Sequence, residues 1–273
     1  MSTTDQEHRL RAELVETGRR LYEHSFVSGT DGNLSVRLGP DLMLTTPSGV
    51  HKGTMRPEEI VTCDLSGRAV GDGGRPSSEI RMHLLVYEAR PDVAAAIHAH
   101  PVHAVALSLV GVSLAECLLP EPALALGAIP TAPYATPTTE DVPESIRDLL
   151  ACGTNALVLA RHGTLTLGRS LEEAYVRLET LEHAARITAV ARSMGVPTPL
   201  PAREVERIER IARGLGVARP APQCSQCGTC GQPAGAGGGA LGGSDTREHL
   251  VRELTDAVLR RLSHDRVPGD TSR

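Results

Sequence analysis

Apolar residues recur at helical spacing in some stretches of the chain and form short runs in others. Residues 6–24 place leucines at helical spacing among charged side chains, which predicts an amphipathic opening helix. The stretch "SGTDGNLSVR" (28–37) is rich in Gly, Asp and Asn, and we interpret it as a loop. It leads into two short predicted strands, "LMLTT" (42–46) and "IVTCD" (60–64), and helical spacing returns in residues 77–89.

Predicted strands and helices alternate over the next part of the chain, residues 93–214. Residues 93–100 are typical of a buried strand, residues 101–110 of a helix, and residues 155–168 of two strands that break at His162. Two further helices are expected, over about 170–194 and 202–214. Interleaved strands and helices predict a layered α/β domain over residues 1–215.

The composition changes after residue 215. Residues 216–243 are rich in Gly, Pro and Cys, which predicts a flexible linker. Residues 244–264 carry an apolar stripe at helical spacing opposite Arg and Glu, which predicts an amphipathic helix, and residues 265–273 are expected to be a disordered tail. Because an isolated helix of about 18 residues is marginal in water, this helix is expected to dock on a partner or on the chain's own core.

Three cysteines of the linker, Cys224, Cys227 and Cys230, have the spacing of thiolate metal ligands. A closed zinc site takes four ligands, and no histidine follows these cysteines at ligand spacing. Metal binding and a solvated, thiol-bearing linker therefore both stay open.

Composition and charge narrow the class of protein. The chain of 273 residues is 40% hydrophobic, enough for a packed core, and its scattered charges sum to −5. Neither this charge pattern nor the 2% aromatic content favours a nucleic acid as partner. The N-terminus lacks a signal-peptide pattern, and no apolar run approaches the ~18 residues that span a bilayer, so we expect a cytoplasmic protein without membrane contact.

Two histidines stand one residue apart in the stretch "AAAIHAHPVH" (94–103). Residues i and i+2 of a strand point to the same face, so His98 and His100 are expected to lie side by side. Glu79 and His162 are further candidate ligands, and three imidazoles with one carboxylate suit a divalent ion such as zinc. Taken alone, the histidine pair is explained as well by a structural role as by metal binding.

Six motifs resemble, in order and spacing, the class II aldolase and adducin-head family, and the resemblance covers about residues 8–212. The motifs are "GTDGNLSVR" (29–37), "TPSG" (46–49), "PSSE" (76–79), "HAHPVH" (98–103), "APYATPTT" (132–139) and "RHGTLTLG" (161–168). L-Fuculose-phosphate aldolases and ribulose-5-phosphate 4-epimerases are its best-known enzymes.

This resemblance implies a three-layer α/β sandwich, in which helices flank a central, mostly antiparallel β-sheet, and a homotetrameric assembly. It also implies one Zn²⁺ per subunit, or another divalent metal, with Glu79, His98, His100 and His162 as ligands. Glu79 would in addition leave the ion when substrate binds and act as acid/base. The positions that match the family's phosphate-binding residues are Gly32, Asn33, Ser48, Gly49, Ser77 and Ser78.

The reaction implied is retro-aldol cleavage of a deoxyketose 1-phosphate such as L-fuculose 1-phosphate, to dihydroxyacetone phosphate and L-lactaldehyde. A divalent ion would stabilise the enediolate that forms beside the ketone. The fuculose-phosphate aldolases carry a tyrosine near the metal where this chain offers Leu119 and Glu121, so the aldehyde produced is an open question. A pentulose-phosphate 4-epimerase is the alternative enzyme, and a non-catalytic, adducin-like interaction module is the alternative of another class.

The predicted terminal helix over 244–264 resembles the encapsulation peptides of enzymes in bacterial microcompartments. That resemblance implies a shell protein as partner and a location inside such a compartment. Docking of the helix on the chain's own core or within the tetramer is the alternative.

Overall fold

The computed structural model of the chain describes residues 3–71 and 74–214. Within them the helices are α1 (Thr3–Glu23), the 3₁₀ turn η1 (Pro57–Glu59), α2 (Ile80–Ala89), α3 (Val102–Leu109), α4 (Pro120–Ala125), α5 (Asp141–Ala151), α6 (Leu171–Met194) and α7 (Ala202–Gly214). The strands are β1 (Asn33–Arg37), β2 (Leu42–Thr45), β3 (Val61–Asp64), β4 (Ala95–Ala99), β5 (Thr131–Ala132), β6 (Ala156–Leu159) and β7 (Gly163–Gly168). The predicted linker, terminal helix and tail, with Cys224, Cys227 and Cys230, lie outside the described residues.

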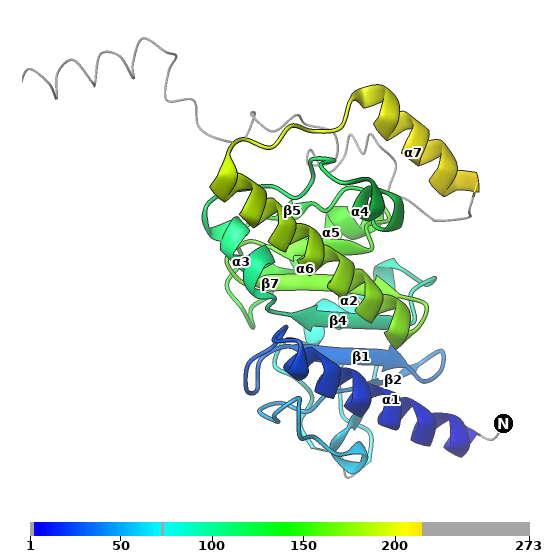
Figure 1. Cartoon of the computed structure of the whole chain (residues 1–273). Coiled ribbons are helices and arrows are strands. Elements are labelled where there is room, and N and C mark those ends of the chain that lie inside the picture. The colour runs from blue at the N-terminus through cyan, green and yellow to red at the C-terminus, as the bar shows by residue number, and fades with distance from the viewer. Residues whose placement is uncertain (1–2, 72–73, 215–273) are drawn as a thin grey trace, which may run out of the picture. The chain divides into compact units, whose positions relative to one another are not determined.

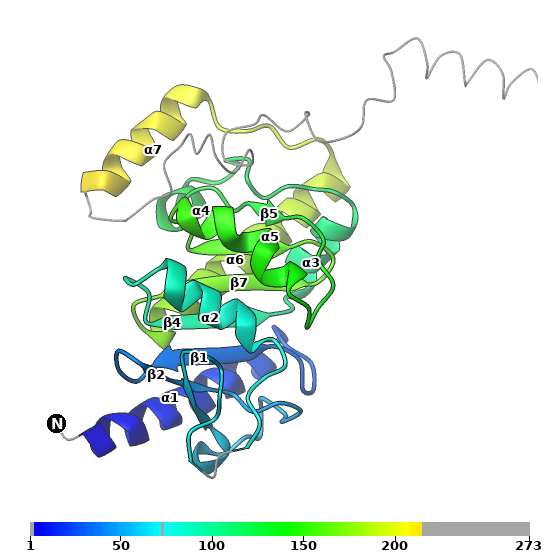
Figure 2. The same ribbon diagram turned by 180° about the vertical axis from the view of Figure 1, so that it is seen from behind.

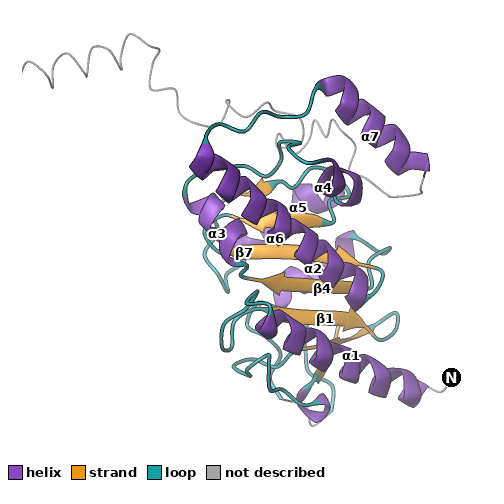
Figure 3. Ribbon diagram, in the orientation of Figure 1, coloured by secondary structure: helices purple, strands orange, loops and turns teal. Residues whose placement is uncertain are grey.

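The strands form one seven-stranded sheet in the order β3-β2-β1-β4-β7-β6-β5 (Figure 3). Only the β5–β6 pair is parallel, and the other neighbouring strands in this sheet run antiparallel. Helices cover both faces (Figures 1 and 2). The expected three-layer α/β sandwich with a mostly antiparallel sheet is confirmed.

Two hydrophobic layers hold the helices on the sheet. On one face, Leu14 of α1 and Tyr175 of α6 pack with Ile97 of β4 in one buried cluster. On the other face, Met82 of α2 and Ile146 of α5 join a second cluster. Because side chains alternate along β4, His98 points to the face that carries α2, opposite to the face of its neighbour Ile97.

The prediction of a loop over residues 28–37 is wrong for its second half, which forms β1. Leu34 and Val36 lie on one face of this strand and are buried with α1, whereas Ser35 points to the other face and bonds to α2. The polar Ser35 interrupts the apolar run, so this segment does not look like a buried strand in the sequence. The Gly and Asn residues before it favour a turn. The strands predicted at 42–46, 60–64, 93–100 and 155–168 are confirmed to within a few residues.

Helix α5 was not predicted, although its sequence carried the signal. Val142, Ile146, Leu149 and Leu150 are spaced four, three and one residues apart and form its buried face. The short elements α4 and β5 were missed as well, whereas the predicted helices that correspond to α1, α2, α3, α6 and α7 are confirmed. None of the helices in the described part of the chain is long and apolar enough to cross a membrane.

Candidate active site

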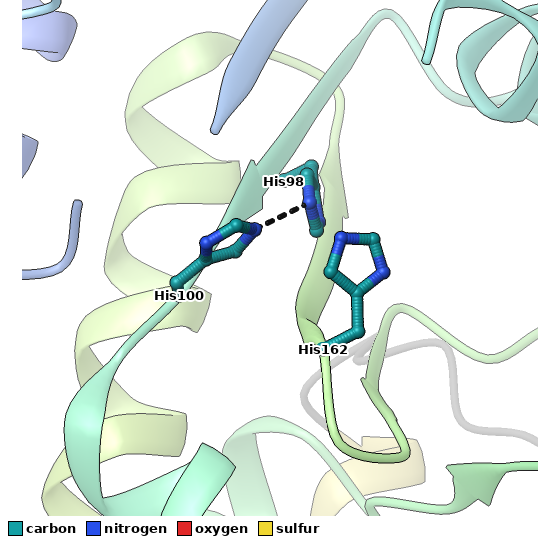
Figure 4. Close-up of side chains that lie close together, drawn as sticks. All are labelled: His98, His100 and His162. Atoms are coloured by element: carbon teal, nitrogen blue, oxygen red, sulfur yellow. Dashed lines mark hydrogen bonds between the residues drawn. The ribbon is translucent and has the colours of Figure 1, made fainter. Parts of the chain in front are cut away.

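Three histidines from two strand ends converge at one point (Figure 4). His98 is the second-last residue of β4, and His100 follows the end of that strand. His162 lies in the turn that joins β6 to β7. Antiparallel pairing of Ala99 with Thr164 brings that turn beside the end of β4. The Nε2 atoms of His98 and His100 are 2.9 Å apart, and one nitrogen from each of the three rings falls within a span of 4.8 Å.

The β6–β7 turn has a backbone that permits this close approach. Arg161 adopts a positive φ of 60°, as expected for the left-handed position in a three-residue hairpin loop. At Gly163 a Cβ atom would lie 2.4 Å from the carbonyl oxygen of Ala99, and it would also meet the rings of His100 at 2.7 Å and His98 at 2.9 Å. Only glycine therefore fits between the turn and the histidine rings.

Glu79 joins the histidines from the N-terminal end of α2. Its Oε2 atom lies 3.3 Å from Nε2 of His98, and its Oε1 atom lies 3.2 Å from Nε2 of His162. The Oε1 atom is buried and has no hydrogen-bond partner within the described part of the chain. The structure thus brings together all four residues that the sequence had suggested as metal ligands.

Protonation favours the forms of these groups that bind metals. Burial, followed by the charges of His98 and His162, lowers the pKa of His100 to about 3, so its imidazole is neutral at pH 7. Burial of Glu79 opposes ionisation, but the electrostatic attraction of the nearby His162 and His98 rings outweighs it, and the pKa of Glu79 lies well below its usual range. A neutral imidazole and an ionised carboxylate are the forms of these two side chains that bind a divalent ion.

The hydrogen bond of His98 on its far side supports the same reading. Its Nδ1 atom lies 2.9 Å from the carbonyl oxygen of Thr164, which can only accept, so Nδ1 carries a proton. The other ring nitrogen, Nε2, faces a carboxylate oxygen of Glu79, and a cation bound between them would contact both atoms. Metal-ligating histidines typically have such a carbonyl partner. The residues present therefore fit a divalent ion, whose identity the structure does not give.

The six predicted phosphate-binding positions lie in three segments that contact one another, and the first of these segments includes Asn33, the first residue of β1. Pro47 and Pro76 form a β-bridge, and the N–H of Ser48 donates to the carbonyl of Arg75, so the loop with Ser48 and Gly49 lies against the loop with Ser77 and Ser78. Ser77 accepts a hydrogen bond from the N–H of Glu79. Asn33 is already engaged by its side chain, since its Nδ2 donates to Glu79 at 2.9 Å.

Lys52, which the sequence reasoning did not single out, ties two of these loops together. The residue is 2% exposed, and its ammonium donates to the carbonyl oxygens of Thr30 and Val50, each at 2.9 Å. Burial lowers the pKa of Lys52 to about 8, against the opposing charge of Asp31. A lysine in a polar segment gives no pattern in one sequence, so only the fold could place it here.

The segment that departs from the fuculose-phosphate aldolases forms the start of α4. Leu119 precedes the helix, and Glu121 lies in its first turn. Ser78 and Glu79 instead share a small pocket with Thr138 and Thr139, which follow "PYA" in the sequence.

The fold carries three clustered histidines that could hold a metal ion, and the family comparison agrees with this class of protein. The Class II Aldolase and Adducin N-terminal domain matches residues 12–189. The chain belongs to this family and is an enzyme of the class II aldolase type.

Its relatives carry several activities. It is 32% identical to an L-fuculose phosphate aldolase of Methanococcus vannielii over 181 residues, 66% of this chain and 96% of that protein. It is 32% identical to a 3-oxo-tetronate 4-phosphate decarboxylase of Pectobacterium atrosepticum over 66% of this chain and 84% of that one. A methylthioribulose-1-phosphate dehydratase of Methylococcus capsulatus is 37% identical over 63% of this chain and 89% of its own length.

A solved structure of an L-fuculose 1-phosphate aldolase superposes with a TM-score of 0.69 at 33% identity, covering 75% of this chain and 96% of that one. The likeness confirms the class II aldolase fold. The aldolase, decarboxylase and dehydratase names leave the substrate to be assigned.

Proposed function

We propose that this chain cleaves a phosphorylated deoxyketose beside its ketone, with L-fuculose 1-phosphate as the leading substrate and dihydroxyacetone phosphate and L-lactaldehyde as products. The observation that carries this proposal is the buried, unpartnered oxygen of Glu79 among three imidazoles. Zinc is the metal proposed, held by His98, His100 and His162 and, before substrate binds, by Glu79. When bound, a divalent ion supplies Lewis-acid stabilisation of the negative charge that develops on the substrate oxygens.

The chain's own residues supply the proton transfer and the orientation. In cleavage, the hydroxyl on the far carbon of the breaking bond loses its proton and becomes the aldehyde, and the electron pair of that bond moves toward the ketone. A proton then reaches the carbon beside the ketone through the carboxyl group of Glu79, so the proton that the hydroxyl loses balances the one that the carbon gains. In condensation, the same carboxylate takes that proton away. The loops that carry Gly32, Ser48 and Ser77 would hold the phosphate with backbone N–H groups and hydroxyls, so that the reacting carbon stays near Glu79.

Decarboxylation of a phosphorylated 3-oxo acid and dehydration of a phosphorylated ketose are second candidates, because relatives at similar identity bear these names. Both reactions also place negative charge next to a carbonyl. A 4-epimerase would break and re-form the same bond and release no aldehyde.

The test combines metal analysis with product analysis. The purified protein is assayed for zinc per subunit and for turnover of L-fuculose 1-phosphate, 3-oxo-tetronate 4-phosphate, methylthioribulose 1-phosphate and L-ribulose 5-phosphate, before and after chelation. We expect about one zinc per subunit, as in a single-ion site, and chelator-sensitive release of dihydroxyacetone phosphate. Turnover of another substrate alone would reassign the reaction, and turnover that persists without metal would overturn the proposal.

A homotetramer is proposed as the assembly. Val102 and Val110 at the two ends of α3, and Val190 and Met194 near the end of α6, are exposed apolar side chains that a second copy would cover.

Replacement of Lys52 by methionine is expected to raise KM for the phosphorylated substrate about tenfold, with kcat changed less than about threefold, because hydrogen bonds from a charged group contribute 1.5–3 kcal/mol. The ammonium joins the loops proposed to bind phosphate, and methionine keeps its volume. In the wild type, KM should also rise above about pH 8 as Lys52 loses its proton, and this rise should be absent from the variant. Steady-state kinetics from pH 6 to 9.5 measure both effects.

Arg56→Met is the matched control, because Arg56 is an exposed cation of the same segment, paired with Glu58 and Glu59. Its KM should match that of the wild type. An equal rise in both variants would point to general charge attraction and contradict a specific role of Lys52.

We propose residues 244–264 as a targeting helix that docks on a microcompartment shell protein, on the basis of their sequence pattern. Deletion of residues 244–273 is expected to leave kcat and KM unchanged while releasing the enzyme from co-purified shells. Sedimentation and activity of the two forms check this. Loss of the tetramer on deletion would instead show that the segment belongs to the enzyme's own assembly.

A further inference from the structure

A chain of buried hydrogen bonds runs behind the candidate active site and ends on Glu79. The hydroxyls of Tyr87 and Ser35 lie 2.7 Å apart, and Oγ of Ser35 lies 2.6 Å from Nδ1 of His83. Nε2 of His83 bonds to Oδ1 of Asn33, whose Nδ2 donates to Oε2 of Glu79. The four residues behind Glu79 are all nine-tenths or more buried.

The spacing of these residues explains how they meet. Glu79, His83 and Tyr87 are four residues apart and lie on one face of α2 and its N-terminal flank. Asn33 and Ser35 are two apart on β1 and face the same side of the sheet. One helix face thus lies along one strand face, and its polar side chains interleave.

The direction of donation along this chain is fixed at its Glu79 end. An ionised carboxylate only accepts, so Asn33 presents its N–H₂ group to Glu79 and its carbonyl oxygen to His83. Nε2 of His83 must then carry a proton. Burial, and next the charge of His98, lower the pKa of His83 to about 3, so its ring is neutral and Nδ1 accepts from Ser35, which in turn accepts from Tyr87. Each bond thus donates toward Glu79.

This polarity gives the two carboxylate oxygens different roles. Oε2 is held by Asn33, whereas Oε1 has no hydrogen-bond partner among the described residues. A carboxylate tied through one oxygen presents the other in a fixed position, which is what proton transfer to a carbon requires.

We propose that His83 is a positioning residue that acts through Asn33 to orient the carboxylate of Glu79, so that Oε1 is the oxygen that exchanges a proton with the substrate. The proposal rests on the proposed function for the reaction itself. Among the described residues, the side-chain hydrogen bonds of His83 go to Ser35 and Asn33 and not to the three clustered imidazoles. It contributes by keeping Asn33 turned with its donor toward Glu79.

Two substitutions separate this role from a merely structural one. In His83→Gln an amide N–H reaches roughly the place of Nε2 and can still donate to Asn33, whereas in His83→Asn the shorter amide can serve only Ser35. Loss of a residue that hydrogen-bonds a metal ligand typically lowers activity 10- to 100-fold. In His83→Asn, kcat should therefore fall by about that factor. In His83→Gln, which keeps the donor to Asn33, kcat should fall less than about fivefold, below the range for complete loss of such a partner. KM should be nearly unchanged in both variants.

Tyr87→Phe removes only the last hydroxyl of the chain and should behave like His83→Gln. Melting temperatures and metal content are measured for all three variants. Equal losses in His83→Gln and His83→Asn, or kcat losses that follow the melting temperature, would overturn the positioning role.

A measurement on the wild type tests the chain without substrate. In ¹⁵N-histidine spectra, the resonance that His83→Gln removes should report a neutral ring protonated at Nε2 from pH 5.5 to 8. A ring protonated at Nδ1, or an imidazolium, would contradict donation from Nε2 of His83 to Asn33 and overturn the proposal. Failure of the wild type to turn over any of the sugar phosphates would overturn the proposed function, whereas this spectrum depends on the hydrogen bonds alone.

Discussion

Glu79→Gln is expected to lower kcat by about 10²- to 10⁴-fold, the range by which a positioned acid/base accelerates a reaction. The amide keeps the volume of the carboxylate and can still accept the hydrogen bond from Asn33. It cannot take up or return a proton at pH 7, so the step beside the ketone loses its acid/base. Steady-state kinetics of cleavage at saturating substrate measure the loss.

Glu79 is also a proposed metal ligand, so the variant is assayed with zinc added in excess and with its metal content determined. Glu172→Gln is the matched control, since Glu172 is an exposed carboxylate whose contact is an ion pair with Arg20. A kcat within a few-fold of the wild type in Glu79→Gln, with metal bound, would remove Glu79 from the proposed mechanism.

His100→Ala is expected to lower the affinity for zinc by more than about 100-fold. His100 is a proposed direct ligand, and loss of a residue that only hydrogen-bonds a ligand already lowers metal affinity 10- to 100-fold. His100 is the ligand to change first, since its side chain is 27% exposed and its loss leaves no closed cavity, whereas His98 is fully buried. Turnover should fall with the bound metal. Equilibrium dialysis against buffered zinc, with elemental analysis of both forms, gives the affinities.

His24→Ala provides the comparison, because His24 is a half-exposed histidine near Glu179 on the surface. Its zinc affinity and turnover should match those of the wild type. If His100→Ala bound zinc as tightly as His24→Ala, the histidine cluster would have to be a structural arrangement without a metal.

Local patterns predicted most of the elements that build the site. The small, apolar run before His98 is a buried strand, and the two-residue period correctly placed His98 beside His100. What the pattern could not supply is the register of β4 against β7, which brings His162 to the same point from more than sixty positions along the chain. Residue type alone made His162 a candidate ligand, and the family resemblance was the stronger reason to join it to His98 and His100.

The residues that support the site were harder to find because their signals are faint. His83 and Tyr87 follow Glu79 at intervals of four, a period that predicts a common helix face, but a polar stripe facing a strand looks like a solvated one in a sequence. β1 was missed for the same reason, since Ser35 is polar and yet buried. Buried polar networks join residues that are distant in sequence, here those of β1 and α2. A single sequence does not indicate which of its polar residues will pair in this way.

Gly163 has a further consequence for protein engineering. Any side chain at this position would collide with the carbonyl of Ala99 and with two histidine rings, so a saturation library there should yield almost entirely inactive clones. Thr139 lines the pocket beside Glu79, whereas its neighbour Thr138 has a positive φ of 68° that restricts the residues that fit there. A library that seeks a changed substrate preference therefore has to vary positions such as Thr139 and leave the turn between β6 and β7 as it is.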